Sequence, residues 1–318
     1  MQELKELLKS KLASGAVSQI LGWKAGETAL DPEPAFFKSP ESLDEFVYNG
    51  FCGANLSKYL IGVKEPTLVL LKPCDSYSFN QLVKEHRIDP QVVTVLGVGC
   101  KGKLDPRKCA DFGVKGILNV TVYEAERVVF DTVYGEKTVP YDDMMLERCS
   151  CCKGKTHVVE CETWGESRDT HSKDRMTEVK RIEAMSSAER FAFFQSQLSK
   201  CIRCNACRNV CPACSCRKCV FDGTQFDAVQ KANPDPFQEK MFHIIRAFHV
   251  TGRCTDCGEC SRVCPERIPL HLLNRKFLQD ANDLFGEFVP GADDCTPVPL
   301  NRFEKDDPEP NDERGRCQ

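Results

Sequence analysis

The sequence has no run of 18 or more consecutive apolar residues, so it predicts no membrane-spanning helix. It also has no excess of positive charge. The net charge is −4 at pH 7, which argues against binding to nucleic acid or to an anionic membrane. The N-terminus, MQELKELLKSKL, is charged and amphipathic and lacks the apolar core of a secretory signal. We therefore expect a cytoplasmic protein.

Cysteine is the residue that the sequence has in excess, at 21 of 318 positions. Disulfides are rare in a reducing cytoplasm, so thiols at this frequency indicate metal or cluster ligands. Thiolates in such number are sensitive to oxygen, which suggests an anaerobic setting. A chain of 318 residues has room for about two domains of ordinary size.

Two segments, 201–212 and 254–265, repeat one cysteine spacing. They read CIRCNACRNVCP and CTDCGECSRVCP, and each fits the pattern C-x2-C-x2-C-x3-C-P that holds a 4Fe-4S cluster. In two-cluster ferredoxins the fourth Cys of each run ligates the other cluster. The sequence therefore predicts two clusters, one on Cys201, Cys204, Cys207 and Cys264, and the other on Cys254, Cys257, Cys260 and Cys211. Zinc is the alternative, but zinc favours two C-x2-C pairs and uses neither a third Cys nor a Pro.

Residues 1–153 alternate short apolar runs with helical patterns, which predicts an α/β domain with an at least partly parallel sheet. Ser78 and Gln81 form a capping-box pattern, which predicts a helix that continues to about His86. The Gly- and Pro-rich residues 22–45 are expected to form a surface loop. The predicted strands are residues 67–71, 92–98, 116–123 and 127–134, and a first helix is predicted from Leu4, Leu7, Leu8 and Leu12.

Two cysteines directly follow predicted strands, Cys74 after the first and Cys100 after the second. If these strands are neighbouring and parallel, both thiols emerge at the carboxyl edge of the sheet, where α/β folds place ligands. With Cys149 and Cys152 they could ligate a third 4Fe-4S cluster or a zinc ion; otherwise they are small buried side chains. The loop 97–102 matches G-x-G-x-x-G, the pattern of dinucleotide-binding loops. A Cys lies within it and no helix follows at once, so we interpret the loop as a tight turn instead.

Beyond residue 153 the composition changes. Residues 154–187 are polar and of mixed charge, which predicts a linker, and residues 188–288 carry helical apolar stripes around the cysteine runs, which predicts a mainly α-helical ferredoxin domain. Ser186 and Glu189 form a capping box at its start. Residues 289–318 are rich in Pro and acidic side chains and are expected to form an irregular tail. Three surplus thiols are either ligands of a further cluster, with Cys149 or Cys152 as remote partners, or redundant: Cys214, Cys216 and Cys219.

Residues 186–286, with the segment GRCTDCGECSRVCPERIPL, resemble the dicluster iron–sulfur subunits of heterodisulfide reductases, anaerobic glycerol-phosphate dehydrogenases and related electron-transfer complexes. Upstream, FCGANLSKYL, KPCDSYSFNQLV and GVGCKG within residues 42–153 are similar to the beta subunits of deazaflavin-reducing hydrogenases and formate dehydrogenases. That resemblance implies an iron–sulfur cluster and FAD, with electrons passed to or from a nicotinamide or a deazaflavin. Those beta subunits have a long flavin-binding portion after their clusters and this chain a short tail, so FAD stays an open alternative.

We expect an electron-relay subunit of an anaerobic oxidoreductase complex, which passes single electrons between a flavin or metal active site on a partner and another carrier. The expected partners are flavoprotein, hydrogenase, formate dehydrogenase or heterodisulfide-reductase-like subunits. A relay needs no catalytic residues, and the sequence shows no Ser/His/Asp or paired-carboxylate signature. The alternatives are a catalytic subunit with its own flavin and a structural zinc module. Basic residues such as Arg203 in the first run, and Asp256 and Glu259 in the second, predict clusters of unequal potential.

Overall fold

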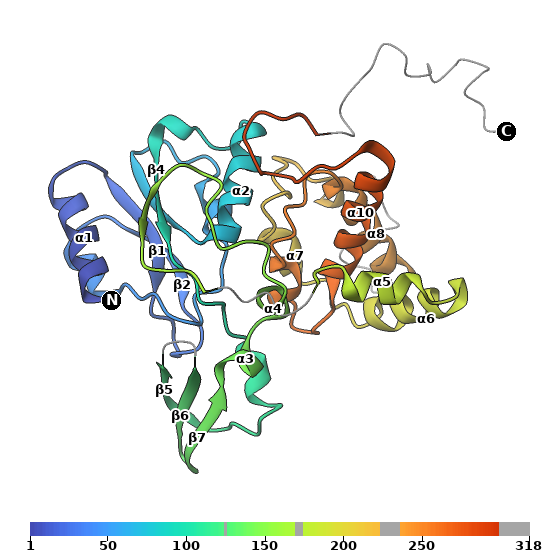
Figure 1. Cartoon of the computed structure of the whole chain (residues 1–318), viewed down its shortest axis with the longest axis horizontal. Coiled ribbons are helices and arrows are strands. Elements are labelled where there is room, and N and C mark those ends of the chain that lie inside the picture. Colours follow the sequence, from blue (N-terminus) through green and yellow to red (C-terminus); the bar gives the residue numbers. More distant parts are fainter. Residues whose placement is uncertain (124–125, 169–173, 223–235, 299–318) are drawn as a thin grey trace.

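The computed structural model describes residues 1–123, 126–168, 174–222 and 236–298. The strands and most of the helices lie in different parts of the molecule (Figure 1). A five-stranded sheet and its helices form one side of the molecule, and helices α5–α10 form the other. The strand order in this sheet is β2-β1-β3-β4-β8. The strands are β1 (Gln19–Lys24), β2 (Glu33–Phe37), β3 (Thr67–Leu71), β4 (Val93–Val98) and β8 (Glu162–Trp164).

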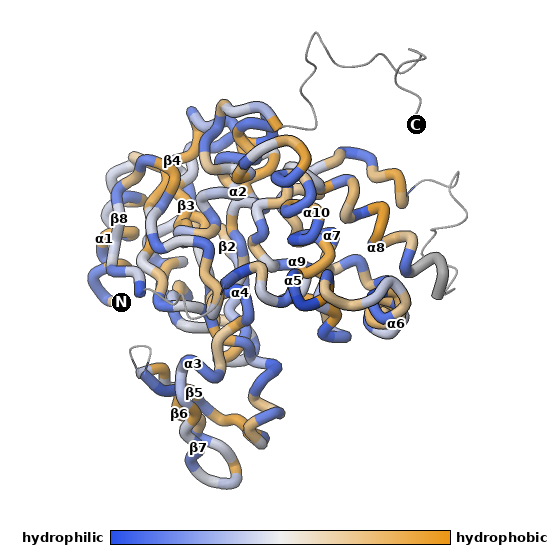
Figure 2. Tube along the Cα trace, turned by 45° about the vertical axis from the view of Figure 1, so that its right-hand side comes forward, coloured by the Kyte–Doolittle hydropathy of each residue, from blue (hydrophilic) through white to orange (hydrophobic). Residues whose placement is uncertain are grey.

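The two central strands, β3 and β4, are parallel neighbours, as the sequence predicts, with Thr67 opposite Val93. Every residue of β3 is buried, which explains its unbroken apolar sequence TLVLL. The hydrophobic colour of both strands is visible in Figure 2. Helix α2 (Pro73–Lys84) connects them, and α1 (Gln2–Ala13) buries Leu4 and Leu8 against the same core.

Two local predictions in this part were wrong. The predicted loop 22–45 contains the end of β1 and all of β2, which pair antiparallel in a polar and proline-containing edge that strand patterns do not reveal. Helix α2 begins at Pro73 rather than near Ser78, because Pro is preferred in the first turn of a helix, and Ser78 is buried inside the helix.

A second, three-stranded antiparallel sheet projects from the body at the bottom of Figure 1. Its strands β5 (Ile117–Tyr123) and β6 (Arg127–Thr132) match two predicted strands, and β7 (Gly135–Pro140) completes it. Val128 and Phe130 are fully buried between this sheet and the two short helices that follow it. These helices are α3 (Tyr141–Met144) and α4 (Glu147–Ser150), and α4 leads the chain into Cys151 and Cys152.

The segment predicted as a linker, 154–187, contains regular structure: β8 pairs with β4, and α5 (Thr177–Glu183) packs on α10. The capping box of Ser186 and Glu189 opens α6 as predicted, and in residues 174–222 and 236–298 we find helices and no strand. The remaining helices are α6 (Ser187–Leu198), α7 (Ala206–Asn209), α8 (Pro236–Val250), α9 (Glu259–Arg262) and α10 (Leu270–Phe285).

The predicted tail begins after α10, and its residues 289–298 form turns and no regular element. They pack back onto α2, where a Cβ at Gly291 would lie 1.8 Å from the carbonyl oxygen of Tyr77. Lys84 of α2 pairs with Asp293 at 3.4 Å. Residues 299–318 of the predicted tail lie outside the described part. Within the described residues, no helix is long and apolar enough to cross a membrane.

Candidate iron–sulfur centre

The two cysteine runs share an unusual backbone conformation. Arg203 and Asp256, each two residues after the first Cys of its run, have φ values of +53° and +51°. Asn205 and Gly258, which precede α7 and α9, are also left-handed, with φ of +61° and +68°. Non-glycine residues rarely adopt this region, and such strain concentrates at functional sites. The sequence repeat is therefore also a repeat in backbone conformation.

The structure brings thiols of the two runs close to one another, and the crosswise assignment of the eight ligands stays a prediction. The thiol of Cys211, from the first run, interacts electrostatically with those of the second run, Cys254, Cys257 and Cys260. Conversely, the thiol of Cys207 in the first run interacts electrostatically with that of Cys264 in the second run, and also with that of Cys204. All of these thiols except Cys204 are buried or half-buried. Cys201 is half-buried and packs against the same apolar cluster as Cys207 and Cys264.

A buried arginine from α8 lies between the runs. Arg246 is 3% exposed and donates from Nη2 to the carbonyl oxygen of Cys207 at 3.1 Å. Burial disfavours its charge, but electrostatic interactions with Cys211, Cys214, Cys260 and Cys207 hold the pKa of Arg246 well above the ordinary value. Its Nε is buried without a partner in the described part of the chain. A negatively charged cluster between the runs would balance the buried positive charge of this side chain, so the donor set fits 4Fe-4S clusters.

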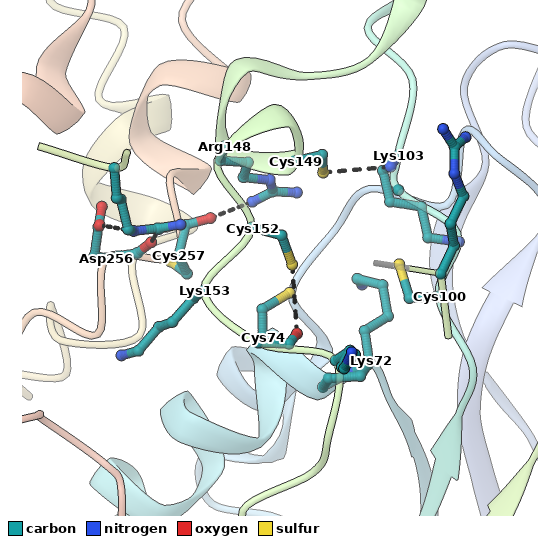
Figure 3. A pocket seen from close by; sticks show the side chains of 16 residues that line it. Lys72, Cys74, Cys100, Lys103, Arg148, Cys149, Cys152, Lys153, Asp256 and Cys257 are labelled. Atoms are coloured by element: carbon teal, nitrogen blue, oxygen red, sulfur yellow. Dashed lines mark hydrogen bonds and ion pairs between the residues drawn. The ribbon is translucent and has the colours of Figure 1, made fainter. Parts of the chain in front are cut away.

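A second group of thiols lines one cavity at the carboxyl edge of the main sheet (Figure 3). Because β3 and β4 are parallel neighbours, the residues that follow them, Cys74 on α2 and Cys100 on the next loop, face the same space. Cys149 and Cys152 join them from α4 and its end. Electrostatic interactions link Cys100 with Cys74 and with Cys149, and Cys149 with Cys152. The loop 97–102 is therefore one wall of a cysteine-lined cavity.

The same cavity is lined by buried cations. Lys72 and Lys103 are 0% and 3% exposed, and Arg148 is 8% exposed. Burial lowers the pKa of Lys103 and lowers that of Lys153 to about 8, whereas Asp75, at 2.6 Å, offsets burial at Lys72 and raises its pKa. Several cations around four thiols stabilise thiolates or an anionic cluster and would repel a further cation.

This cavity adjoins the second cysteine run, because Asp256 and Cys257 contribute to its lining. Three basic side chains make the connection, and Arg148 is the first, donating to the carbonyl oxygen of Cys257. Arg175 donates to the carbonyl oxygens of Cys151 and Asp256. Lys153 reaches the carbonyl oxygen of Thr255 at 3.1 Å. Sequence reasoning missed all three, since single basic residues in polar segments give no spacing signal.

The three surplus cysteines lie elsewhere. Cys214, Cys216 and Cys219 line a different cavity from that of Cys149 and Cys152, so the structure does not bring these two groups together. Cys214 instead donates a thiol hydrogen bond to Cys211, which lowers the pKa of Cys211. Among the described residues, no three His, Cys, Asp or Glu side chains surround a single point as one metal ion requires. A zinc ion needs its donors about 2.0–2.3 Å from one centre, whereas a cubane spreads its ligands over four iron corners.

Comparison with known proteins agrees with this geometry. Residues 197–268 match the family described as the 4Fe-4S dicluster domain. The chain is 24% identical, over 363 aligned positions, to the beta subunit of the F420-dependent formate dehydrogenase of Methanocaldococcus jannaschii, with 95% of this chain and 93% of the relative covered. The beta subunit of F420-dependent formate dehydrogenase 1 of Methanococcus maripaludis is also 24% identical, with 92% and 91% covered.

A solved structure is similar in part. It is the F420-reducing NiFe hydrogenase complex of Methanosarcina barkeri, with 13% identity and a TM-score of 0.37 over 47% of this chain. The chain spans 58% of the length of that solved chain.

The matched segment and its two cysteine runs indicate the class: residues 197–268 are similar to 4Fe-4S dicluster domains, so the chain contains an iron–sulfur domain of this kind. Over most of its length it is similar to the beta subunits of F420-dependent formate dehydrogenases, which confirms the resemblance seen in the sequence.

Proposed function

We propose that the chain is a relay subunit of a cytoplasmic formate dehydrogenase- or hydrogenase-type complex and passes single electrons between a partner's active site and another carrier. The observation that carries this proposal is the crosswise approach of Cys211 to the second run and of Cys264 to the first. When bound, 4Fe-4S clusters at these sites would each accept and release one electron. The protein residues hold the thiolates, exclude water with α8 and α10, and supply the buried charge of Arg246.

Anaerobic reconstitution tests the relay. We expect a brown protein with iron and acid-labile sulfide in equal amounts and two interacting clusters in the EPR spectrum of the reduced state. Cys211→Ser is expected to perturb the cluster of the second run, and Cys264→Ser that of the first. A colourless preparation, or one that contains zinc without sulfide, would contradict the proposal.

We extend the proposal to a third 4Fe-4S cluster on Cys74, Cys100, Cys149 and Cys152. It is supported by the shared cavity, by the surrounding cations and by the contact with Cys257. In this arrangement Arg148 and Lys153 stand between the third site and the second run. The double variant C74S/C100S is expected to lose about four iron atoms per chain. The matched control is Cys161→Ser, a half-buried thiol at the same sheet that does not line the cavity; it is expected to keep all of its iron.

A second candidate function, a flavin-containing subunit, is favoured by a cavity of about 520 Å³ beside Cys100. Tyr48, Tyr141 and Trp164 line it together with glycines of the 97–102 loop. Aromatic walls and close backbone suit a planar ring system at the carboxyl edge of a parallel sheet. Purification without oxygen decides between the two: a yellow chromophore released by denaturation indicates a flavin, and its absence from protein with full iron content indicates the relay alone.

A further inference from the structure

A basic groove lies on the surface beside the first cysteine run. It consists of two adjoining cavities of about 770 and 370 Å³ that share Lys58, Cys214 and Cys216. Among the described residues, two carboxylates line them, Asp89 and Asp222. The Lys and Arg side chains of the lining are Lys58, Lys64, Arg87, Arg208, Arg217, Arg246 and Arg253. On a chain whose net charge is −4, this local excess of positive charge is distinctive.

Part of this charge is neutralised within the protein. Arg253 forms an ion pair with Glu85 at 2.5 Å, and Arg208 forms one with Asp222 at 2.7 Å. Lys64, Arg87 and Arg217, in contrast, form no ion pair with a carboxylate of the described residues, and Lys64 and Arg217 are exposed. The neighbouring Lys218, also exposed, adds a further positive charge. Within the part of the chain that the structure describes, the groove therefore has more cations than carboxylates to pair with them.

The groove is built on the predicted electron path. Cys214 lines both cavities, and its backbone N–H donates to the carbonyl oxygen of Cys211 at 3.1 Å. Lys58 of the N-terminal part, in the short helix Leu56–Leu60, donates to the carbonyl oxygen of Cys214 and so connects this loop to the N-terminal part. Arg246, which contacts the first run, also lines the smaller cavity. An electron carrier bound here would lie against the backbone that holds the Cys211 thiolate.

We propose that the basic groove is the docking site of an acidic protein electron carrier of the small ferredoxin type. This inference rests on the relay function proposed above. One electron leaves the reduced carrier and enters a cluster of this chain, and no bond is made or broken. Redox partners of this kind meet through small, transient interfaces, and complementary charge speeds their encounter and weakens with salt. An open groove of two cavities suits the convex, acidic surface of such a partner.

The test uses the full chain, reconstituted without oxygen, and a purified acidic ferredoxin with two 4Fe-4S clusters as the reduced probe. Stopped-flow absorbance measures the second-order rate of reduction. We expect the double variant R217E/K218E and, independently, Lys64→Glu to lower this rate, the double variant by about tenfold at low salt, and added salt to lower the wild-type rate similarly. The matched control K115E/K137E makes the same charge change on exposed residues of the β5–β7 lobe and is expected to keep at least half of the wild-type rate.

Reduced methyl viologen, a small cation that needs no docking site, separates this inference from the relay itself. It should reduce the wild type and all variants at equal rates, and a chain that it cannot reduce would overturn the relay. Equal rate losses in R217E/K218E and K115E/K137E, or a rate that salt does not change, would overturn the docking site alone. So would inhibition by pyrophosphate beyond that of chloride at equal ionic strength, because it would assign the groove to a small anion.

Discussion

Arg148 of α4 and Glu259 of α9 form an ion pair, with Nη1 and Oε1 2.6 Å apart, although 111 positions separate them in the sequence. Both side chains are buried, and the same guanidinium donates to the carbonyl oxygens of Gly53 and Cys257. One arginine thus connects the strand-containing half, the cysteine cavity at its sheet edge and the second cysteine run. Relative movement of these parts would separate buried charges, so we infer that the pair holds the electron path rigid.

Removal of the Glu259 charge is expected to destabilise the whole chain. Glu259→Gln leaves Arg148 buried without its counter-ion, and loss of one partner of a buried pair costs about 3–5 kcal/mol. The control is Asp174→Asn, which breaks the exposed Lys180–Asp174 pair and should lower the stability far less, because solvent screens exposed charges. Anaerobic urea unfolding, followed by circular dichroism, measures both. Equal midpoints for the two variants would show that the buried pair has no special role.

Gly258 makes room for Arg148. A Cβ on Gly258 would meet Cδ of Arg148 at 2.8 Å, and the residue has φ of +68°. Gly15 has nearly the same φ, +70°, but apart from its chain neighbours no heavy atom of the described residues lies within 4 Å of its Cβ position. Alanine at either position costs about 1–2 kcal/mol for the left-handed backbone, and only Gly258→Ala must also displace the guanidinium. We therefore expect Gly258→Ala to unfold at lower urea than Gly15→Ala, by about 1–3 kcal/mol.

His271 of α10 is expected to make stability depend on pH. Burial lowers its pKa from 6.5 to about 4, because the opposing attraction of Glu147, 3.2 Å from Nε2, is weaker. Arg275, Arg175 and Asp256 also face the ring. The unfolded chain takes up this proton near pH 6.5 and the folded chain only near pH 4. Stability present above pH 6.5 is therefore lost as the pH falls towards 4, by about 2–3 kcal/mol.

His271→Gln should remove this part of the pH dependence, since glutamine takes up no proton. Free energies of unfolding between pH 7 and pH 4.5 provide the comparison. A His271→Gln profile parallel to that of the wild type would refute the assignment.

Local patterns predicted the local features. The spacing of Cys201, Cys204 and Cys207 fixes their approach within one turn-rich segment, and the Ser186 capping box opens α6 where expected. The convergence of Cys74 and Cys100 also followed, because parallel strands require it. Each of these inferences depends on contacts within a few residues or on a general rule of sheet geometry.

Long-range charge pairing could not be predicted. In the sequence Asp256 and Glu259 look like a negative environment for the second run, but each is paired with two arginines in the fold. Arg175 lies 81 positions from its partner Asp256, and no spacing rule connects them. The sequence also did not predict that α8 buries Arg246 between the runs, because this packing depends on contacts between distant parts of the chain. Acidic residues near a cluster site in the sequence therefore do not by themselves predict whether the reduction potential of that cluster is lowered.

The paired charges around Asp256 lead to a redox prediction with opposite signs for the two partners. Burial would raise the pKa of Asp256, but Arg175 and Arg275 hold it below the ordinary value, so the carboxylate is charged beside Cys254 and Cys257. Asp256→Asn removes a negative charge and should raise the potential of the second-run cluster, and Arg175→Gln should lower it. A shift of about 60 mV corresponds to 1.4 kcal/mol for one electron. EPR-monitored titration measures both, and the double variant should return close to the wild-type potential. Shifts of the same sign in the two single variants would show that structural rearrangement, rather than charge, sets the potential.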